Sequence, residues 1–394
     1  TIGTFLSDTK AEDNNWIWNF VGDFSNSPRV VGISYLDADG NTVNYSTGGF
    51  IAGRQTSNNQ IQSIKSAVYL ADEYKGERFN FDIGVRWERA TGIISKETGV
   101  GSNTFNKGRV STDGFAVAAA GLYKVNSNTN IYANASSGYF FPELRGVRFS
   151  SPGQPQSYEP ESVVQGEIGA KFNTGKFAAT GALFLVSLSD RRSVDFVNDG
   201  QGGVREEVSV QSTRTVGIEA SLNYQLSGGL NLYGNVTLQD HEFTEFEGND
   251  ELVGNELRRQ PNIMGLVGLS YDKNRFDFDL SSNFLGSKFA NDANTVELDG
   301  FNIVRASAGY KIDLGDSQSL RLGISVFNLL DTAGVTEGSP RQGNAQIGGG
   351  EFFVGRPILP RRIFFRATFD FLIFHYLVLK QGKGTLTLQL CEEW

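Results

Sequence analysis

The 394-residue sequence has little of what metal sites and hydrolytic enzymes require, since it contains one cysteine and two histidines. The single Cys391 excludes a disulfide framework and a cysteine-based zinc site. His241 and His375 lie far apart in the sequence, so histidine metal sites and Ser-His-Asp catalysis are poorly supplied. We therefore expect no catalytic residue, no metal ion and no cofactor, and we do not expect an enzyme.

Long hydrophobic runs are also absent. Charged residues make up 20% of the chain, and no stretch approaches the roughly 18–20 uncharged apolar residues with which a helix spans a bilayer. The net charge of −9 argues against nucleic acid as the main partner. Disorder is disfavoured, because 39% of the residues are hydrophobic and 12% are aromatic.

The sequence is rich in strict alternation of apolar and polar residues. Residues 79–88 place Phe79, Phe81 and Trp87 on one face of a strand and Asp82 on the other. The same pattern recurs over 216–224, 230–239, 276–284 and 363–371. Because side chains on a strand point alternately to its two faces, each segment has one apolar and one polar face.

Short and long connections alternate between these segments. The short ones are 74–78, 125–130, 173–176, 226–229, 272–275 and 314–318. The long ones are roughly 10–60, 90–112, 141–160, 190–207, 243–259, 287–297 and 331–355. A soluble sandwich does not require this asymmetry, whereas a membrane barrel has short periplasmic turns and long extracellular loops.

The sequence therefore predicts an all-β fold, an antiparallel transmembrane β-barrel of about fourteen strands. The strands are expected near 1–9, 61–73, 78–90, 113–125, 129–140, 162–173, 176–189, 208–226, 229–242, 261–272, 275–287, 298–313, 319–330 and 358–371. Their apolar faces should meet lipid, and we expect this of Phe79, Phe81, Trp87, Leu232, Leu238, Phe276, Phe278, Phe365 and Phe369.

Five segments, taken in order, resemble the C-terminal part of a TonB-dependent outer-membrane receptor. They are SGYFFPELRG (137–146), YEPESVVQGEIGAKF (158–172), TVGIEASLNYQL (215–226), LRLGISVFNLLDT (320–332) and GRPILPRRIFFRATFDF (355–371). Each motif alone is moderately specific, but all five fall in the family's order on strands already predicted from alternation.

The resemblance implies an active-transport receptor of the bacterial outer membrane. It would bind a scarce nutrient such as a ferric siderophore at extracellular loops and pass it through the barrel. Barrels of this family have about 22 strands and a plugged lumen. We therefore expect that the first strands, the plug and the segment that contacts the TonB energy-coupling complex lie outside this sequence.

Several points stay open at this stage. The ligand could be an iron chelate, cobalamin or an oligosaccharide, and a passive outer-membrane porin is the alternative function. The resemblance implies outer-membrane lipid, lipopolysaccharide and the barrel-assembly machinery as further partners. That machinery would recognise the terminal aromatic residue, which is Phe371 here.

Residues 372–394 depart from the family pattern. In 372–379 the alternation is lost, because apolar residues occupy both faces. We therefore expect the barrel portion to be 1–371 and the tail 372–394 to lie outside the wall or to be poorly ordered. Read-through, an out-of-frame join or a natural extra hairpin would each explain the tail.

Candidate ligand-binding residues lie in two predicted loops. The first loop (10–60) carries the aromatic residues Trp16, Trp18, Tyr35 and Tyr45, which could stack on a flat ligand. The alternative is a loop that packs on itself or a girdle at the headgroups. At a predicted strand end, Arg191 and Arg192 could bind an anionic ligand or stabilise the headgroup region.

Polar residues on the inward faces are candidates for contact with the plug and for lining the ligand's path. They are Asp82, Arg86, Glu88, Glu167, Lys171, Glu219, Arg305, Lys311, Arg321 and Arg366. The alternative is that any wall facing water is polar. The acidic loop 242–251 could hold Ca²⁺ but lacks the spacing of a known Ca²⁺ loop, which favours a solvated tip.

Overall fold

The structure is a computed structural model. It describes all residues except 24–28, 33, 37, 45, 48–49, 99–101, 142, 145–146, 148, 156–158, 199–203, 316–317, 342–351, 374–381 and 394. For some strand residues, including Trp16, Trp18, Tyr35 and those of 372–373 and 382–393, it describes the backbone alone. Among the described residues, no helix has the length and apolar character needed to cross a bilayer.

The described elements are strands, apart from the short 3₁₀ helix η2 (Asp250–Leu252). The strands are β1 (Ile2–Asp23), β2 (Arg29–Val31), β3 (Ser34–Leu36), β4 (Thr42–Asn44), β5 (Ser46–Thr47), β6 (Phe50–Lys75), β7 (Phe79–Glu97), β8 (Phe105–Lys124), β9 (Thr129–Phe140), β10 (Phe149–Ser151), β11 (Gln154–Pro155), β12 (Glu161–Asn173), β13 (Phe177–Asn198), β14 (Val204–Ser227), β15 (Leu230–Phe246), β16 (Ile263–Lys273), β17 (Phe276–Leu285), β18 (Lys288–Phe289), β19 (Glu297–Leu298), β20 (Phe301–Gly315), β21 (Gln318–Phe327), β22 (Val335–Arg341), β23 (Phe352–Pro357), β24 (Arg362–Ile373) and β25 (Gly382–Glu393).

In the described part of the chain, seventeen strands belong to one sheet. Three of these are the short β2 and β5 and the tail strand β25, and the other fourteen coincide with the fourteen predicted strands. Their paired neighbours run antiparallel, as in β12–β13 and β13–β14. The predicted all-β, antiparallel barrel fold is confirmed.

Several strands are longer than the sequence predicts. β1 continues to Asp23 and β6 begins at Phe50, so the first loop is shorter than the predicted 10–60. β13 and β14 likewise extend to Asn198 and back to Val204. A strand that continues beyond the bilayer is wet on both faces, so the alternation that identifies a lipid-facing strand is not required of it.

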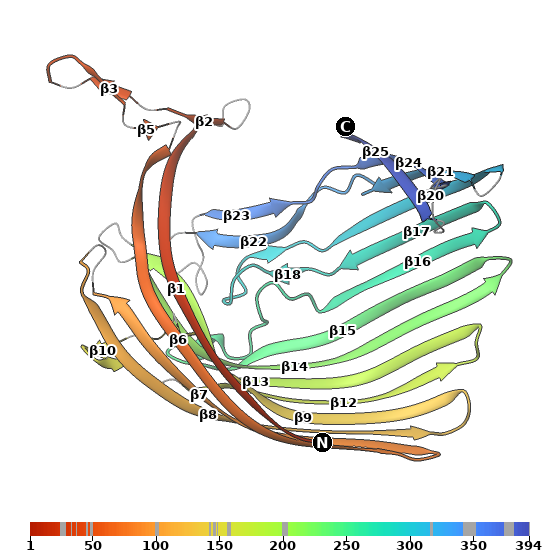
Figure 1. Cartoon of the computed structure of the whole chain (residues 1–394), viewed down its shortest axis with the longest axis horizontal. Coiled ribbons are helices and arrows are strands. Elements are labelled where there is room, and N and C mark those ends of the chain that lie inside the picture. The colour runs from red at the N-terminus through yellow and green to blue at the C-terminus, as the bar shows by residue number, and fades with distance from the viewer. Residues whose placement is uncertain are drawn as a thin grey trace. The chain divides into compact units, whose positions relative to one another are not determined.

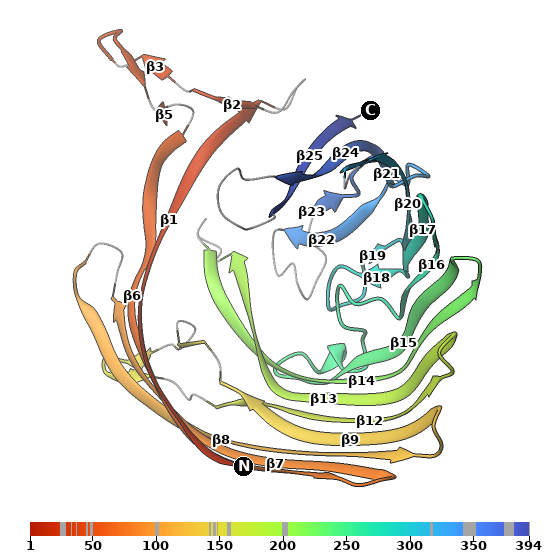
Figure 2. The ribbon, with the colours of Figure 1, turned by 45° about the vertical axis from the view of Figure 1, so that its right-hand side comes forward.

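The chain forms two compact units, and the larger one comprises residues 71–84, 117–138 and 161–394. Within it β12, β13, β14, β15, β16, β17, β20, β21 and β24 are each hydrogen-bonded to the next, and we call these nine strands the wall. They lie side by side in chain order (Figures 1 and 2). Their long connections carry the small hairpins β18–β19 and β22–β23. We call the end of the wall that carries the short connections 174–176, 228–229 and 274–275 the turn end. The opposite end, which carries the long connections, is the loop end.

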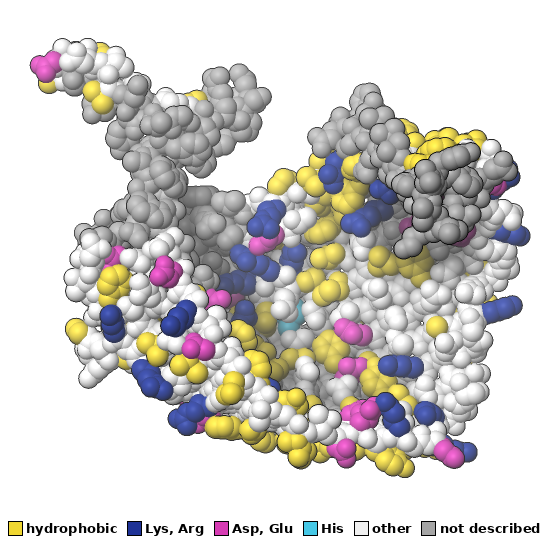
Figure 3. Space-filling view, viewed as in Figure 1, with side chains coloured by type: hydrophobic (Ala, Val, Ile, Leu, Met, Phe, Trp, Pro, Cys, Tyr) yellow, Lys and Arg dark blue, Asp and Glu magenta, His cyan; other side chains and the backbone are white. Residues whose placement is uncertain are grey.

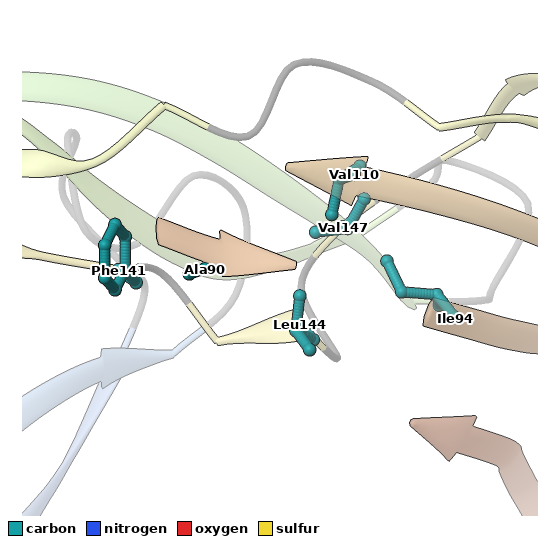
Figure 4. Close-up of a cluster of buried hydrophobic side chains, with 6 residues drawn as sticks. All are labelled: Ala90, Ile94, Val110, Phe141, Leu144 and Val147. Atoms are coloured by element: carbon teal, nitrogen blue, oxygen red, sulfur yellow. The ribbon is translucent and has the colours of Figure 1, made fainter. Parts of the chain in front are cut away.

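The other unit comprises residues 1–70, 85–116 and 139–160. Here β1 pairs with β6 from Ile2↔Leu70 to Phe20↔Phe50. A small core forms where the segment after β9 packs on β7 and β8. Its buried side chains, shown in Figure 4, are Ala90, Ile94, Val110, Phe141, Leu144 and Val147.

The apolar faces of the strands are not packed into a closed interior. Phe79, Trp87, Leu238, Phe276 and Phe365 each expose between 41% and 46% of their surface. Such a surface is unfavourable in water and is required where a strand meets lipid. The exposure of these five side chains agrees with the predicted orientation, whereas Phe81, Leu232, Phe278 and Phe369 are half-buried, and contact of these faces with lipid stays a prediction.

Aromatic side chains gather at the turn end of the wall. Phe177 lies beside the turn 174–176 and contacts both Phe172 and Tyr224, with ring centroids 6.0 Å and 5.7 Å away. At the turn between β16 and β17, Tyr271 and Phe276 lie 5.9 Å apart. Aromatic girdles mark the membrane–water interface of outer-membrane barrels, so this end lies at one interface.

On the polar face, tyrosines lie flat over glycines of the neighbouring strand. A methyl group added to Gly268 would lie 2.3 Å from the Tyr233 ring, and one added to Gly169 would lie 2.6 Å from the Tyr132 hydroxyl. The Tyr233 hydroxyl donates a hydrogen bond to Asp279 at 2.6 Å. Aromatic rings over glycines fix strand register, so these pairs hold β15 against β16 and β9 against β12.

The tail differs from the expectation in one respect. β24 ends at Ile373, close to the predicted end at Phe371, but β25 then pairs antiparallel with β24. Residues 385–390 alternate Thr or Gln with Leu, and this pattern suits an edge strand. That residues 372–394 are not part of the receptor's own barrel domain stays a prediction.

We expect Gly268→Ala to destabilise the wall by about 1–3 kcal/mol, because the new methyl group displaces the Tyr233 ring and its hydrogen bond. The measurement is urea unfolding of the chain in lipid vesicles. Gly323→Ala is the matched control, since its methyl group meets no atom closer than 3.7 Å. The prediction fails if both variants unfold at the same urea concentration.

Deletion of residues 372–394 should improve membrane insertion. It removes β25 from the outer edge of β24 and restores Phe371 as the terminal residue. In a closed barrel every strand is paired on both edges, so the outer edge of β24 must be free to pair with another barrel strand. The measurement is heat-modifiable gel mobility of the full-length receptor with and without the tail. Poorer insertion after deletion would show that the tail is a working part of the barrel.

Candidate functional site

The polar face of the wall carries paired charges at its turn end. Arg321 lies 2.6 Å from Asp277, across three neighbouring strands. Arg275 lies 3.0 Å from Asp313, and Lys311 lies 3.9 Å from the same carboxylate. Two of the predicted inward-facing residues, Lys311 and Arg321, thus take part in ion pairs along this face.

Arginines and aromatic rings occupy the loop end of the same face. Arg305 on β20 and Arg362 on β24 both stack on Phe327 of β21, at 4.9 Å and 5.0 Å from the ring centroid. Arg362 also lies 5.8 Å from the centroid of Phe364. Arg366, one more predicted inward-facing residue, is exposed on β24. Arg305 was expected on this face, but its stacking partner Phe327 and Arg362 were not singled out.

The hairpins above the wall add further cations. Lys288 on β18 is 7% exposed and lies over the Phe301 ring, with its Nζ 5.8 Å from the centroid. Burial lowers the pKa of Lys288 below its ordinary value, and the Glu337 carboxylate opposes this shift. Glu337 on β22 also lies 3.5 Å from Arg259 and 3.4 Å from Arg356. One carboxylate therefore faces three cationic side chains.

A small apolar core organises the loop after β15. Phe243, Phe246, Leu252 and Leu257 are buried together, and the first two rings lie 5.2 Å apart. His241 is 1% exposed, and its Nδ1 accepts a hydrogen bond from the Leu257 N–H at 3.1 Å. This long loop is folded against the strand that precedes it.

Asparagine side chains join this loop to the next one. Asn294 accepts a hydrogen bond from the Glu256 N–H at 2.7 Å and donates one to the Glu256 carbonyl at 2.9 Å. Asn255 donates to the Asp292 carbonyl at 2.9 Å, and Arg258 lies 3.2 Å from the Asp292 carboxylate. We call residues 250–262 and 287–297 together the loop platform. Sequence reasoning missed it, although the Asn-rich run 291–294 was a usable signal.

The acidic loop 242–251 does not form a metal site among the residues that the structure describes. Glu242 lies 2.5 Å from Arg214, and Glu245 accepts a hydrogen bond from Ser212 at 3.0 Å. Both contacts join β14 to β15, so residues 242–246 lie in a paired strand and not in a loop as predicted. A solvated acidic tip over 247–251 stays a prediction.

In the smaller unit, Arg86 and Glu88 lie together as predicted for one face of β7. The Glu88 carboxylate is 2.6 Å from the Arg86 guanidinium and accepts a hydrogen bond from the Tyr139 hydroxyl at 2.9 Å. Arg86 also lies 5.5 Å from the Phe5 centroid. Sequence reasoning did not identify Tyr139 or Phe5 as partners.

The remaining inward-facing candidates divide into two kinds. Glu167 accepts a hydrogen bond from Tyr132, and Lys171 lies over the same ring at 4.8 Å. Asp82 and Glu219 are exposed. Contact of any of these residues with a plug stays a prediction.

Two groups of ligand-binding candidates lie elsewhere than expected. Arg191 and Arg192 lie within β13, paired with Gln211 and Val210, and not at a strand end. A register shift between Leu188 and Arg191 precedes them. The extension of β13 beyond its alternating part is the reason for this error.

The aromatic candidates are affected in the same way. Trp16 and Trp18 lie in β1 and not in a loop, and their side chains are outside the described part. Tyr35 lies in β3 with its backbone paired to Val43, and Tyr45 lies outside the described residues. Phe371 stacks on Phe369 at 5.4 Å in β24. Ligand contact and recognition of Phe371 by assembly machinery stay predictions.

Comparison with known proteins agrees with this architecture. The family model described as "TonB dependent receptor-like, beta-barrel" matches residues 2–329. An uncharacterized TonB-dependent receptor of Haemophilus influenzae is 31% identical over 129 residues, which are 32% of this chain and 36% of that protein.

Solved structures show the same fold. The unliganded ferric citrate transporter FecA is 20% identical with a TM-score of 0.64, over 88% of this chain and 49% of FecA. The siderophore receptor PiuA of Acinetobacter baumannii is 15% identical with a TM-score of 0.64, over 99% of this chain and 53% of PiuA. The chain spans about half the length of these two structures. Since the family model covers most of the chain and the fold agrees, the protein belongs to the TonB-dependent receptors of the Gram-negative outer membrane, within their β-barrel.

Proposed function

We propose that this chain forms part of the β-barrel of an active-transport receptor. The receptor binds a scarce nutrient such as a ferric siderophore at its extracellular loops and passes it through the barrel. The observation that carries the proposal is the match of the receptor-barrel model to residues 2–329. The names of structural neighbours such as FecA and PiuA support nutrient uptake, and no neighbour reported above supports a passive porin.

The mechanism is binding and passage, not catalysis. The ligand first meets the loop platform, whose apolar core and asparagine bonds hold it in one conformation. A preorganised surface loses little conformational entropy when it binds. Displacement of a plug then opens the path, which the polar face of the wall lines with charged and hydroxyl groups.

The partners follow from the same architecture. Energy coupling to the TonB complex would use receptor segments other than the barrel wall. The exposed apolar faces of the strands contact outer-membrane lipid, and lipopolysaccharide covers the outer leaflet. The barrel-assembly machinery would recognise the C-terminal aromatic residue Phe371.

Uptake by cells tests this function. Cells that carry the full-length receptor should take up its nutrient only when the TonB complex and the proton gradient are intact. Cells that carry residues 1–394 alone should not take up the nutrient, because the fourteen long strands leave free edges. The measurement is growth and radiolabelled uptake under iron limitation.

Two results would contradict this proposal. Uptake that persists without the TonB complex would indicate a passive channel. Uptake by cells that carry only residues 1–394 would show that this chain is itself a complete porin. An inactive full-length receptor with its TonB-contacting segment deleted serves as the control for expression.

A further inference from the structure

The loop end of the polar face holds two arginines on opposite strands around one phenyl ring. Phe327 and Arg362 are register partners on β21 and β24. Arg305 precedes Ala306, which pairs with Val326, so it lies beside Phe327 on the other flank. The sheet register itself therefore builds the order Arg305, Phe327, Arg362 across three strands.

These two guanidinium groups differ from the two arginines at the turn end of the same face. Arg275 and Arg321, at the turn end, each lie within 3.0 Å of a carboxylate. In the described part of the chain, Arg305 and Arg362 have no ion pair, and their contacts are with aromatic rings. The Arg362 Nε is buried and has no hydrogen-bond acceptor among the described residues.

Stacking leaves the hydrogen-bonding capacity of both groups unused. A guanidinium that lies flat over a ring contacts it with its face, while its N–H donors point outward in the plane. This fork of donors matches the two oxygens of a carboxylate or phosphate. Because the Arg362 Nε is itself covered by neighbouring atoms, an oxyanion would bind the terminal N–H groups of this guanidinium.

The surroundings are cationic although the chain as a whole carries a net charge of −9. Lys288 lies over Phe301 on β20, the strand that also carries Arg305. Arg259 and Arg356 share the Glu337 carboxylate on the adjoining hairpin. Figure 3 shows Lys and Arg side chains gathered around β18, β22 and β23. This field attracts anions to the loop end of the wall.

We propose that Arg305, Phe327 and Arg362 form a binding site for an organic anion with two or more carboxylate or phosphate groups. The proposal rests on the proposed uptake function and names the charge class of its ligand. Each guanidinium takes one oxyanion group, and the Phe327 ring between them keeps the two groups apart. A neutral oligosaccharide would leave both forks without a charged partner.

The test uses the full-length receptor in detergent micelles and calorimetric titration at low salt. The probes are citrate, inorganic pyrophosphate and the neutral sugar maltotriose. We expect at least one of the two anions to bind, and binding to weaken about tenfold or more in both Arg305→Gln and Arg362→Gln. Arg275→Gln is the matched control, because that arginine lies on the same face and is paired with Asp313. Maltotriose should not bind.

Conservative variants separate binding from folding. Arg305→Lys and Arg362→Lys keep the charge but lose the fork, so they should bind the anion with intermediate affinity. If the Gln variants lose heat-modifiable mobility, the Lys variants decide the outcome. The proposal is overturned if neither anion binds the unaltered receptor, or if the variants bind as tightly as it does. If anion binding fails but uptake by the full-length receptor depends on TonB, the proposed function stands and only the anion site is refuted. If the anion binds but uptake does not depend on TonB, the proposed function is refuted.

Discussion

The structure depends on one constraint: inside a bilayer every backbone N–H and C=O must find its hydrogen-bond partner within the protein. The wall meets it with nine consecutive antiparallel strands, each paired along its length with the next. Once the backbone is fixed in this way, successive side chains must point to opposite faces. The division into a lipid-facing surface and a polar surface follows directly.

The polar surface is in turn divided along the strands. At the turn end, charges are neutralised in pairs such as Arg321 with Asp277, and tyrosines such as Tyr233 lie over glycines. At the loop end, cations outnumber the carboxylates beside them, as around Glu337. The first region stabilises the wall, and the second has unused capacity to bind a ligand. Under the proposed function, structural contacts and ligand binding therefore use different stretches of the same strands.

The sequence was sufficient for the fold because alternation is a local signal. It located all fourteen long strands and placed Arg305 and Arg321 on the polar face. It failed where strands continue past their alternating part, since Trp16 and Arg191 lie in such extensions of β1 and β13. It also missed contacts between distant segments, such as Asn294 with Glu256, because no periodicity encodes them. The tail strand β25 was missed because its alternation begins only after residue 384.

The division of the strands into two faces is the central claim, and spin-label accessibility tests it most directly. Single cysteines at positions 276 to 280 of β17, introduced after Cys391→Ser, would carry a nitroxide in lipid vesicles. Labels replacing Phe276, Phe278 and Leu280 should collide with dissolved oxygen, and labels replacing Asp277 and Asp279 should collide with a water-soluble nickel chelate. Accessibility that does not alternate with a period of two residues, or that alternates with the opposite phase, would contradict the account.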